Sequence, residues 1–484
     1  MMKSIYGLLF AFFCLNILQA QTAADVLRFS YLDVGGTART VGVGGAIGAL
    51  GGDFATLSTN PAGLAVYRRS EFVLTPTLFN ATTVSTLEGA GNEAIEENKT
   101  NFNLNNIGII LTAKPKNLKW QTSNIGIGLN RRANFNNNFY FEGKSKGSIT
   151  TRFVELANTF GLDEFEAGLA DSIEAIFIPN VSGEYIDDIA ETPDLPLKRT
   201  QNVIAKGSIN ELVFSLAGNY DNKIMIGATI GVPFFSYSVE KEYTEEDVEN
   251  GNAIFNSLRF TESIRTNGVG VNLKLGLIYR INQMFRLGAA IHTPTAVSLT
   301  DKYNNTLTYD YTFGANDGPR TARSIEGISE YSIRTPWRAI GSLGVIIKKY
   351  GFLTAEVEWV DYRSASINFD NDREYEREVN GEIEDDFKST LNIRLGGEYA
   401  YEIFRFRAGF GINGTPYADD DIINTSYSLG LGLRERQYYI DFAYRGTQSE
   451  EAYIPYRLAD TAAEQRVSND LSNGRFMLTF GYRF

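Results

Sequence analysis

Apolar and polar residues alternate along most of this chain in segments of about ten residues. The clearest is 389–401, in which Leu391, Ile393 and Leu395 share one face while Arg394 and Glu398 share the other. Segments 404–412 and 438–445 repeat the pattern. A period of two is typical of β-strands, because successive side chains of a strand point to opposite sides. The pattern therefore predicts strands that carry apolar residues on one face.

Fourteen such segments can be counted, and their connections alternate in length. The segments begin near residues 70, 103, 124, 210, 223, 255, 285, 332, 352, 389, 404, 426, 438 and 475. Short links lie at 220–222, 281–283, 349–351, 402–403 and 435–437, and long links at 81–100, 136–208, 301–330, 364–387 and 447–474. An even strand number with short turns at one end and long loops at the other is the layout of outer-membrane barrels. We predict an all-β fold: a 14-stranded transmembrane antiparallel β-barrel.

The longest loop, 136–208, contains a segment with helical spacing. Phe153, Leu156, Phe160 and Leu169 recur at intervals of three or four residues or their multiples. This spacing predicts one helix over residues 152–176. We expect it to cap the extracellular mouth of the barrel.

Residues 35–68 form a stretch that is rich in glycine and alanine and nearly free of charge. Its apolar residues fit neither a strand nor a long amphipathic helix, so it has to be buried by something else. Within it, Asn60-Pro61-Ala62-Gly63 predicts a turn, because proline fixes its own φ and restricts the residue before it.

The run Asn60 to Ala65, placed just before the first strand of a long β-rich chain, resembles the plug of the FadL/TodX family of outer-membrane transporters. Residues 287–303 and 335–344 are similar to that family as well. The resemblance implies a hatch (residues 21–69) in the lumen of a 14-stranded barrel (residues 70–484), with Asn60, Pro61, Ala62 and Gly63 as gating residues. It also implies passive uptake of hydrophobic or amphipathic molecules, such as long-chain fatty acids or aromatic hydrocarbons. Capture from outside would be followed by a hatch shift and lateral exit near the third strand, where residues 131–138 interrupt the alternation.

The two ends of the chain carry targeting signals. Residues 1–20 read as a secretory signal, with Lys3 before an apolar core, so we expect the mature chain to begin at Gln21. Cys14 is the only cysteine, and its removal excludes disulfides, cysteine metal sites and thiol nucleophiles. The last strand ends on Phe484, which resembles the signal read by outer-membrane assembly machinery. These features predict a location in the cell outer membrane.

The remaining composition argues against catalysis and nucleic-acid binding. The formal net charge is −13, so the chain has no electrostatic reason to bind nucleic acid. His292 is the only histidine, alternation places it toward the lumen, and no G-x-S-x-G elbow accompanies it. The acidic clusters at 370–372, 382–386 and 419–421 are expected in solvated loops, with calcium bridging to lipopolysaccharide as the alternative. We expect no enzyme activity, no cofactor, no catalytic residue and no metal site.

Two sets of residues are candidate ligand contacts. Phe54, Leu57 and Leu64 either line an apolar pocket or pack the hatch tightly. Arg394, Arg405 and Arg407 face the lumen, where they either form a cross-strand ladder with carboxylates or bind the carboxylate of a ligand. A turn at Tyr401 and Glu402 would place Glu398 opposite Arg405.

Transport is not the only function that suits this architecture. A non-transporting barrel could act as a scaffold or shuttle for protein secretion or surface attachment, and long acidic loops would suit such a partner. In either case we expect a monomer in contact with outer-membrane lipid and lipopolysaccharide. Binding of a labelled fatty acid distinguishes the two hypotheses.

Overall fold

The computed structural model describes residues 22–116, 119–179, 183–314, 318–370, 372–419 and 423–484. The predicted signal segment with Cys14 lies outside these ranges, and so do Asn371, Asp420 and Asp421 of two predicted acidic loops. None of the helices in the described ranges is long and apolar enough to cross a membrane.

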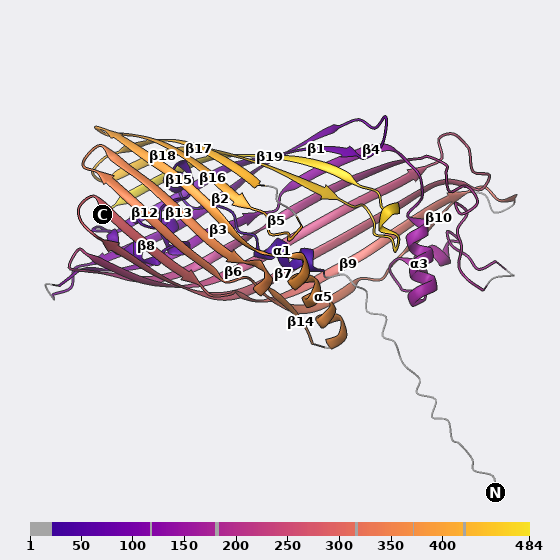
Figure 1. Cartoon of the computed structure of the whole chain (residues 1–484), viewed down its shortest axis with the longest axis horizontal. Helices are drawn as coiled ribbons and strands as arrows, with labels where there is room; N and C mark the ends of the chain where they lie inside the picture. Colours follow the sequence, from indigo (N-terminus) through magenta and orange to yellow (C-terminus); the bar gives the residue numbers. More distant parts are fainter. Residues whose placement is uncertain (1–21, 117–118, 180–182, 315–317, 371, 420–422) are drawn as a thin grey trace, which may run out of the picture.

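One antiparallel sheet closes on itself to form an elongated barrel (Figure 1). The first strand, β1 (Glu71–Leu87), pairs with the last, β19 (Val467–Arg483), from Glu71 opposite Arg483 to Leu87 opposite Val467. The nineteen strands of the sheet occupy fourteen positions around the barrel wall, and each such position is called a stave. The number fourteen confirms the predicted barrel. Closure pairs the backbone of the first and last strands, which a membrane interior requires.

Four staves consist of two strands each, and β10 (Gly318–Arg323) is a hairpin extension. The divided staves are β3 (Trp120–Asn134) with β4 (Asn137–Ser145), β8 (Phe285–His292) with β9 (Ala296–Tyr311), β11 (Gly327–Arg334) with β12 (Arg338–Ile347), and β13 (Gly351–Asp361) with β14 (Ser366–Phe369). The undivided staves besides β1 and β19 are β2 (Ile95–Ala113), β5 (Leu197–Tyr220), β6 (Ile224–Glu246), β7 (Phe255–Arg280), β15 (Ser389–Tyr401), β16 (Phe404–Gly414), β17 (Ile423–Arg434) and β18 (Tyr438–Tyr453).

The outer wall carries an apolar band near the end with short turns. On β7, the outward residues from Val269 to Tyr279 are apolar and exposed, whereas Arg265 and Asn267 before them are polar. This apolar run of about eleven residues is the length that a tilted strand needs to cross a bilayer. Leu391, Ile393 and Leu395 are 41–52% exposed and Arg394 is 8% exposed, so the predicted inward and outward faces of β15 are confirmed.

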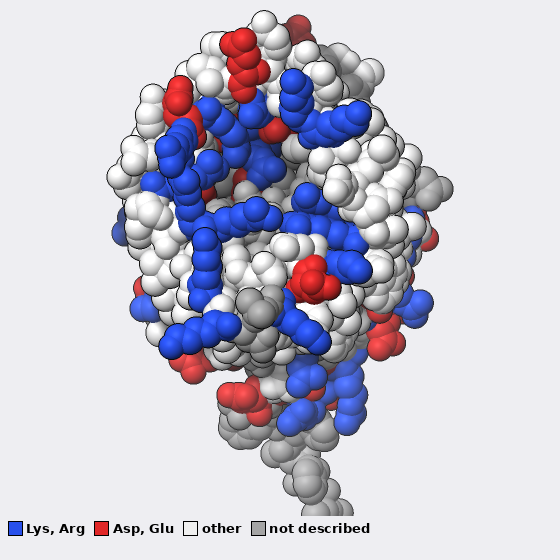
Figure 2. Space-filling model, turned by 90° about the vertical axis from the view of Figure 1, so that its left-hand side faces the viewer, with Lys and Arg blue, Asp and Glu red and all other residues white. Residues whose placement is uncertain are grey.

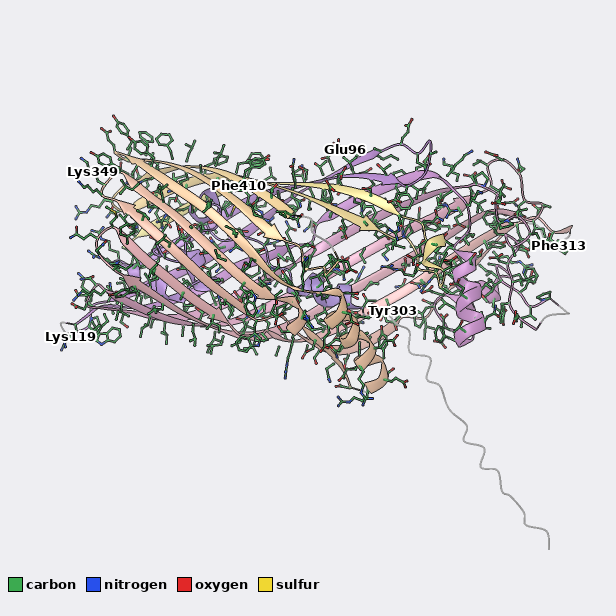
Figure 3. All side chains as sticks on the ribbon, in the orientation of Figure 1. Glu96, Lys119, Tyr303, Phe313, Lys349 and Phe410 are labelled. Atoms are coloured by element: carbon green, nitrogen blue, oxygen red, sulfur yellow. The ribbon has the colours of Figure 1, made fainter. Side chains whose placement is uncertain are left out.

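The strands continue far beyond this band toward the long loops. β5, β6 and β7 have 24, 23 and 26 residues, and Figure 3 places Phe313 at this far end, opposite Lys119 and Lys349. The predicted loops 81–100 and 447–474 are therefore wrong in large part, because β1, β2, β18 and β19 extend into them. Outward residues are polar there, so the strands lose the apolar alternation that marks a lipid-facing wall.

The long-loop end is capped by two short helices rather than one long helix. α3 (Thr150–Phe160) is followed by its C-cap Gly161, whose φ is 87°, and then by α4 (Ala167–Ser172). The Asp163 carboxylate accepts bonds from the backbone N–H groups of Phe165, Glu166 and Ala167, at 2.6, 2.6 and 3.0 Å. The prediction of one helix over 152–176 is thus wrong, since glycine ends the first helix and the Asp163 carboxylate binds the backbone N–H groups that lead into the second.

A further helix, α5 (Arg373–Asp386), occupies the predicted solvated loop 364–387. Its N-cap is Asp372, which accepts a 3.0 Å bond from the Tyr375 N–H. Val379 and Ile383 are buried one turn apart against the cluster that surrounds the N-terminal helix. Only these two apolar positions mark the helix in the acidic sequence, which is why the pattern does not reveal it. Two short 3-10 turns, η4 (Tyr362–Ser364) and η5 (Thr461–Ala463), complete the described wall connections.

Candidate functional site

The N-terminal segment, defined here as residues 22–69, runs inside the barrel (Figure 1). It consists of α1 (Ala23–Ser30), α2 (Ala38–Gly42), η1 (Phe54–Ser58) and η2 (Pro61–Val66). Wall glycines make room for it, because a Cβ atom at Gly108 would lie 2.1 Å from the Phe54 ring and one at Gly126 would lie 2.6 Å from Leu57. Larger residues at these wall positions would collide with the segment.

Asn60 ties this segment together and to the wall. Its side chain is fully buried, and its Oδ1 accepts a 3.2 Å bond from the Ala62 N–H, which caps η2. Its Nδ2 donates to the Gly48 carbonyl at 2.8 Å and to the Leu277 carbonyl of β7 at 3.2 Å. Pro61 follows as the first residue of η2, where its missing N–H costs no hydrogen bond. The Asn60–Gly63 turn is therefore fixed by buried polar contacts.

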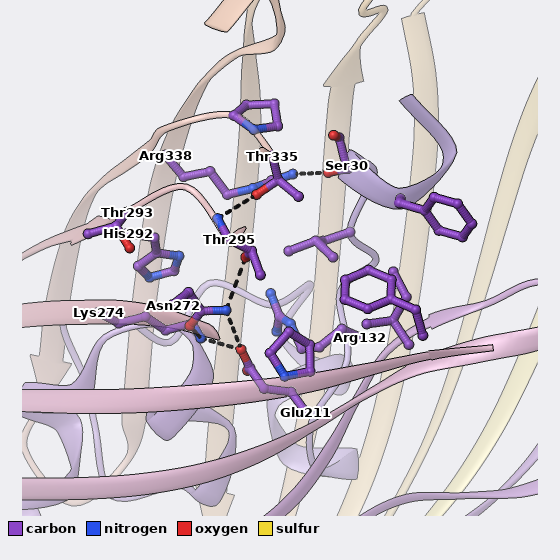
Figure 4. A pocket seen from close by; sticks show the side chains of 16 residues that line it. Ser30, Arg132, Glu211, Asn272, Lys274, His292, Thr293, Thr295, Thr335 and Arg338 are labelled. Atoms are coloured by element: carbon purple, nitrogen blue, oxygen red, sulfur yellow. Dashed lines mark hydrogen bonds and ion pairs between the residues drawn. The ribbon is translucent and has the colours of Figure 1, made fainter. Parts of the chain in front are cut away.

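A buried charged cluster, formed by Glu211, Asn272, Lys274 and His292, contacts the segment just before Asn60. Figure 4 shows Glu211 of β5 meeting Asn272 and Lys274 of β7. Ser58 donates a 2.8 Å bond to the Glu211 carboxylate, and His292 Nε2 donates to the Thr59 carbonyl at 2.6 Å. The predicted lumen-facing position of His292 is confirmed, and its partner is the N-terminal segment.

A cavity of about 490 Å³ lies beside α1 in the lumen. Leu27, Phe79 and Phe135 supply apolar lining, and Asp33, Arg445 and Arg475 supply charge. This volume lies in the range of small-molecule sites. The cavity therefore offers both apolar and cationic surface to one ligand.

Two arginines of this cavity share one carboxylate, that of Asp33. Arg445 and Arg475 lie directly opposite each other on β18 and β19, and both bind Asp33, with 3.1 Å between Arg445 Nη1 and Oδ1. Arg131 lines an adjoining small cavity together with Asp33 and Arg475. Burial opposes ionisation of Asp33, but the two bound guanidinium groups outweigh it and hold the pKa of that carboxyl below its usual range. Arg28, Arg394, Glu450 and Glu451 also line the cavity, so its charged lining contains both signs.

The wall is interrupted next to the cavity. β3 pairs with β2 only from Asn130 opposite Asn106 to Ser123 opposite Ala113, and β4 continues the stave after a bend at residues 135–136. Beyond the bend, β4 pairs with β5 but not with β2, and the Thr83 hydroxyl of β1 donates a 3.0 Å bond to Asn137. Ala133, Asn134 and Phe135 at the bend line the cavity. The interruption falls within the predicted segment 131–138.

Solved structures with the same architecture are known, although no protein-family model and no curated protein matches the sequence. The chain matches a FadL homologue from Pseudomonas aeruginosa with a TM-score of 0.56 and 14% identity, covering 94% of this chain and 100% of that one. The Pseudomonas putida toluene transporter TodX matches with a TM-score of 0.52 and 13% identity, over 93% and 98% of the two chains. The Ralstonia pickettii toluene transporter TbuX matches with a TM-score of 0.51 and 14% identity, over the same shares.

The chain has the FadL fold. At these identities the likeness concerns the fold alone, and it extends over nearly the whole of both chains. Placing the predicted ligand residues on this FadL-type barrel gives two different results for the apolar and the charged set.

Phe54, Leu57 and Leu64 are packed rather than open to the cavity. All three are fully buried in one cluster with wall residues such as Val73 and Val213. None of them lines the cavity beside α1. Their observed role is packing of the N-terminal segment against the wall.

The predicted arginines form the cross-strand ladder. Arg394 binds Glu356 at 3.1 Å and Glu358 at 2.5 Å, and Arg407 binds Glu398 and Asp441, both at 2.7 Å. The register expected for Glu398 is wrong: it lies opposite Arg407, because the turn is Glu402-Ile403, one residue later than expected. Arg405 lies 3.7 Å from Glu398 and donates to backbone carbonyls of the turn.

Sequence reasoning missed five residues of these sites: Arg131, Arg445, Arg475, Glu211 and Lys274. Arg445 ends the predicted alternating segment 438–445, and its inward position was the available signal. No signal in the sequence indicated its pairing with Asp33, which lies 412 residues away. Within the described ranges, no group of three or more histidine, cysteine, aspartate or glutamate residues is placed to hold a metal ion.

Proposed function

We propose that this chain is an outer-membrane transporter for passive uptake of hydrophobic or amphipathic small molecules. The single observation that carries the proposal is the cavity beside α1, which combines apolar lining with arginine side chains and reaches the bend between β3 and β4. The solved structures named as toluene transporters share this fold, which supports transport as the class of function.

The lining of the cavity favours an amphipathic ligand. Arg445 and Arg475 would hold its polar or anionic end, since guanidinium groups form strong, directional bonds to carboxylate. Leu27, Phe79 and Phe135 would take up its apolar part. Long-chain fatty acids have this combination of groups, and an aromatic hydrocarbon would use the apolar part alone.

The route that we propose runs from the long-loop end to the cavity and then sideways through the wall. The N-terminal segment fills the lumen beside the cavity, with Asn60 bound to β7 and Thr59 bound to His292. A shift of this segment, gated by the Asn60–Gly63 turn, would release the ligand toward the bend. Between β2 and β4 no ladder of backbone hydrogen bonds has to be broken for exit.

Uptake by cells tests the proposal. Radiolabelled oleate and toluene are supplied to cells with the full chain and to a strain without it, and uptake is normalised to assembled, heat-modifiable barrel. Uptake above the strain without the barrel is expected, with at least one probe reduced by Arg445→Gln but not by the mouth variant Arg405→Gln. If neither probe enters above the background, the transporter proposal fails and secretion of a surface protein becomes the function to measure.

A further inference from the structure

The end of the barrel with short turns carries a ring of basic side chains. Figure 2 looks onto this end and shows lysine and arginine side chains around the mouth. Six of them, which we call the basic ring, are exposed residues from five separate connections. They are Arg68 before β1, Lys116 between β2 and β3, Lys223 between β5 and β6, Lys348 and Lys349 between β12 and β13, and Arg436 between β17 and β18.

The ring is unexpected in a chain with a net charge of −13. Among the described residues, none of the six forms an ion pair. The exposed carboxylates in the described part of the short turns at this end are Asp221, Glu402 and Glu435, besides the C-terminal carboxylate. Lysine pairs at the long-loop end are different, because Lys144, Lys146 and Lys302 each bind a carboxylate. The basic ring therefore offers unneutralised charge at one end of the molecule.

The position of the ring relative to the apolar band indicates what it meets. Exposed tyrosines lie at the short-turn end of the outer wall, among them Tyr350 beside Lys349 and Tyr438 two residues after Arg436, exposed by 51 and 43%. Tyrosine at the edge of a lipid-facing band marks the level of the headgroups. Lys349 adjoins Tyr350 in one turn, with its Nζ 5.6 Å from the ring centre. Lys349 and Arg436 thus lie beside exposed tyrosines, at the level of headgroup phosphates.

We propose that the basic ring binds the anionic headgroups of phospholipids in the inner leaflet of the outer membrane. This inference rests on the proposed membrane orientation, in which the short turns face the periplasm, and it does not depend on the transported ligand. The distribution around the barrel favours lipid over a protein partner, because an annulus of lipid contacts every turn whereas one protein contacts a sector. Each cation near an anionic surface adds to the attraction, and salt screens it.

Native mass spectrometry of the full chain tests the inference. The purified protein is mixed with equal amounts of phosphatidylglycerol and phosphatidylcholine of the same acyl chains, and the lipids that stay bound are counted. We expect preferential retention of phosphatidylglycerol, reduced by about tenfold when Lys116, Lys223, Lys348 and Lys349 are all changed to glutamine. The matched control changes Lys144, Lys146, Lys206 and Lys302 at the far end and should keep the preference.

Three results would overturn the inference. The first is equal retention of the two lipids by the wild-type chain, and the second is loss of the preference in the far-end control. The third is binding of an oligo-glutamate peptide to the ring without any lipid preference, which would assign the ring to an acidic protein partner. If the four-residue variant fails to assemble, the wild-type chain in rising salt decides, because the preference must fall as salt increases. Failure of oleate and toluene uptake would leave this measurement intact, so the two proposals can fail separately.

Discussion

At the scale of single residues, one buried amide holds the N-terminal segment in place. The Asn60 side chain joins the Gly48 backbone, the start of η2 and the wall strand β7. Alanine at this position would leave the Gly48 and Leu277 carbonyls without these donors. Leaving a buried polar group unpaired costs about 1–3 kcal/mol.

We therefore predict that Asn60→Ala raises local opening of the N-terminal segment about tenfold without preventing barrel assembly. Amide hydrogen exchange over residues 44–66 measures the opening, and heat-modifiable migration measures assembly. Asn98→Ala, on the exposed part of β2, is the control and should leave exchange in this segment unchanged. Equal protection in Asn60→Ala and wild type would contradict the role of the turn.

Asp187 in the cap gives the structure a pH dependence. Burial raises the pKa of this carboxyl above its ordinary 3.8, although the Thr150 hydroxyl and the Ala190 N–H bind it. A carboxyl with a raised folded-state pKa keeps its proton longer in the folded cap than in the unfolded one. Its contribution to stability is therefore present at acid pH and is lost as the pH rises through the folded-state pKa.

We predict that protection of α3 falls as the pH rises from 3.8 toward neutrality. Asp187→Asn should flatten this dependence, and burial shifts the pKa of Asp188 in the same direction, so part of it should remain. Hydrogen exchange over 150–160, corrected for the intrinsic effect of pH, is the measurement. Asp194→Asn at an exposed site is the control. A cap that is better protected at pH 7 than at pH 4 would show the sign to be wrong.

At the scale of elements, the N-terminal segment packs against the wall by placing large side chains opposite wall glycines. Gly126 of β3 leaves the space that Leu57 of η1 fills, and the three atoms nearest to a Cβ atom there would be side-chain atoms of Leu57 and Leu64. Adding a methyl group to a filled site costs about 1–3 kcal/mol. Such a cost should be partly relieved when the opposing side chain is shortened.

A double-mutant cycle tests this fit. Gly126→Ala should destabilise the segment, Leu57→Ala should do so by about 2–5 kcal/mol, and the double variant should be more stable than the sum of the two effects by about 1 kcal/mol. Gly341→Ala is the control, because a Cβ atom at that wall glycine meets nothing within 4 Å. Strict additivity in exchange-derived free energies would mean that the two residues do not share the space.

At the scale of the whole molecule, the pairing of β2 with its neighbour stops at Asn106, beside the bend between β3 and β4. The side chains of Asn134 and Asn101 bridge this interruption with a 3.2 Å bond from Nδ2 to Oδ1. No ladder of backbone bonds joins β2 to β4 there. A covalent link at this point would close the proposed exit and leave the rest of the wall unchanged.

We predict that a disulfide in Asn101→Cys/Asn134→Cys reduces uptake of the transported probe to near background, with recovery on reduction. Thiol labelling confirms the bond, and the mature chain should add no cysteine of its own. Thr200→Cys/Thr244→Cys links two regularly paired strands whose hydroxyl oxygens lie 2.7 Å apart, and it should leave uptake unchanged. Undiminished uptake through the oxidised Asn101–Asn134 pair would exclude the bend as the exit.

The sequence by itself determined the barrel, because a lipid-facing wall demands local alternation that is visible residue by residue. The two-residue period of apolar positions and the loop lengths predicted the fourteen staves, the inward and outward faces of β15 and the lumen position of His292. The ends of the strands did not follow, since above the band the outward face meets water and carries no apolar signal. The split between α3 and α4 was readable in principle from Gly161 and Asp163.

Only the tertiary structure decided the site. Arg394, Arg405 and Arg407 look alike in sequence to Arg445 and Arg475, yet the first three face carboxylates on neighbouring strands while the last two share one aspartate from the other end of the chain. Register sets those partners, and a turn displaced by one residue moved Glu398 from Arg405 to Arg407. The cavity and the basic ring arise where segments far apart in sequence meet, so no local pattern could have placed them.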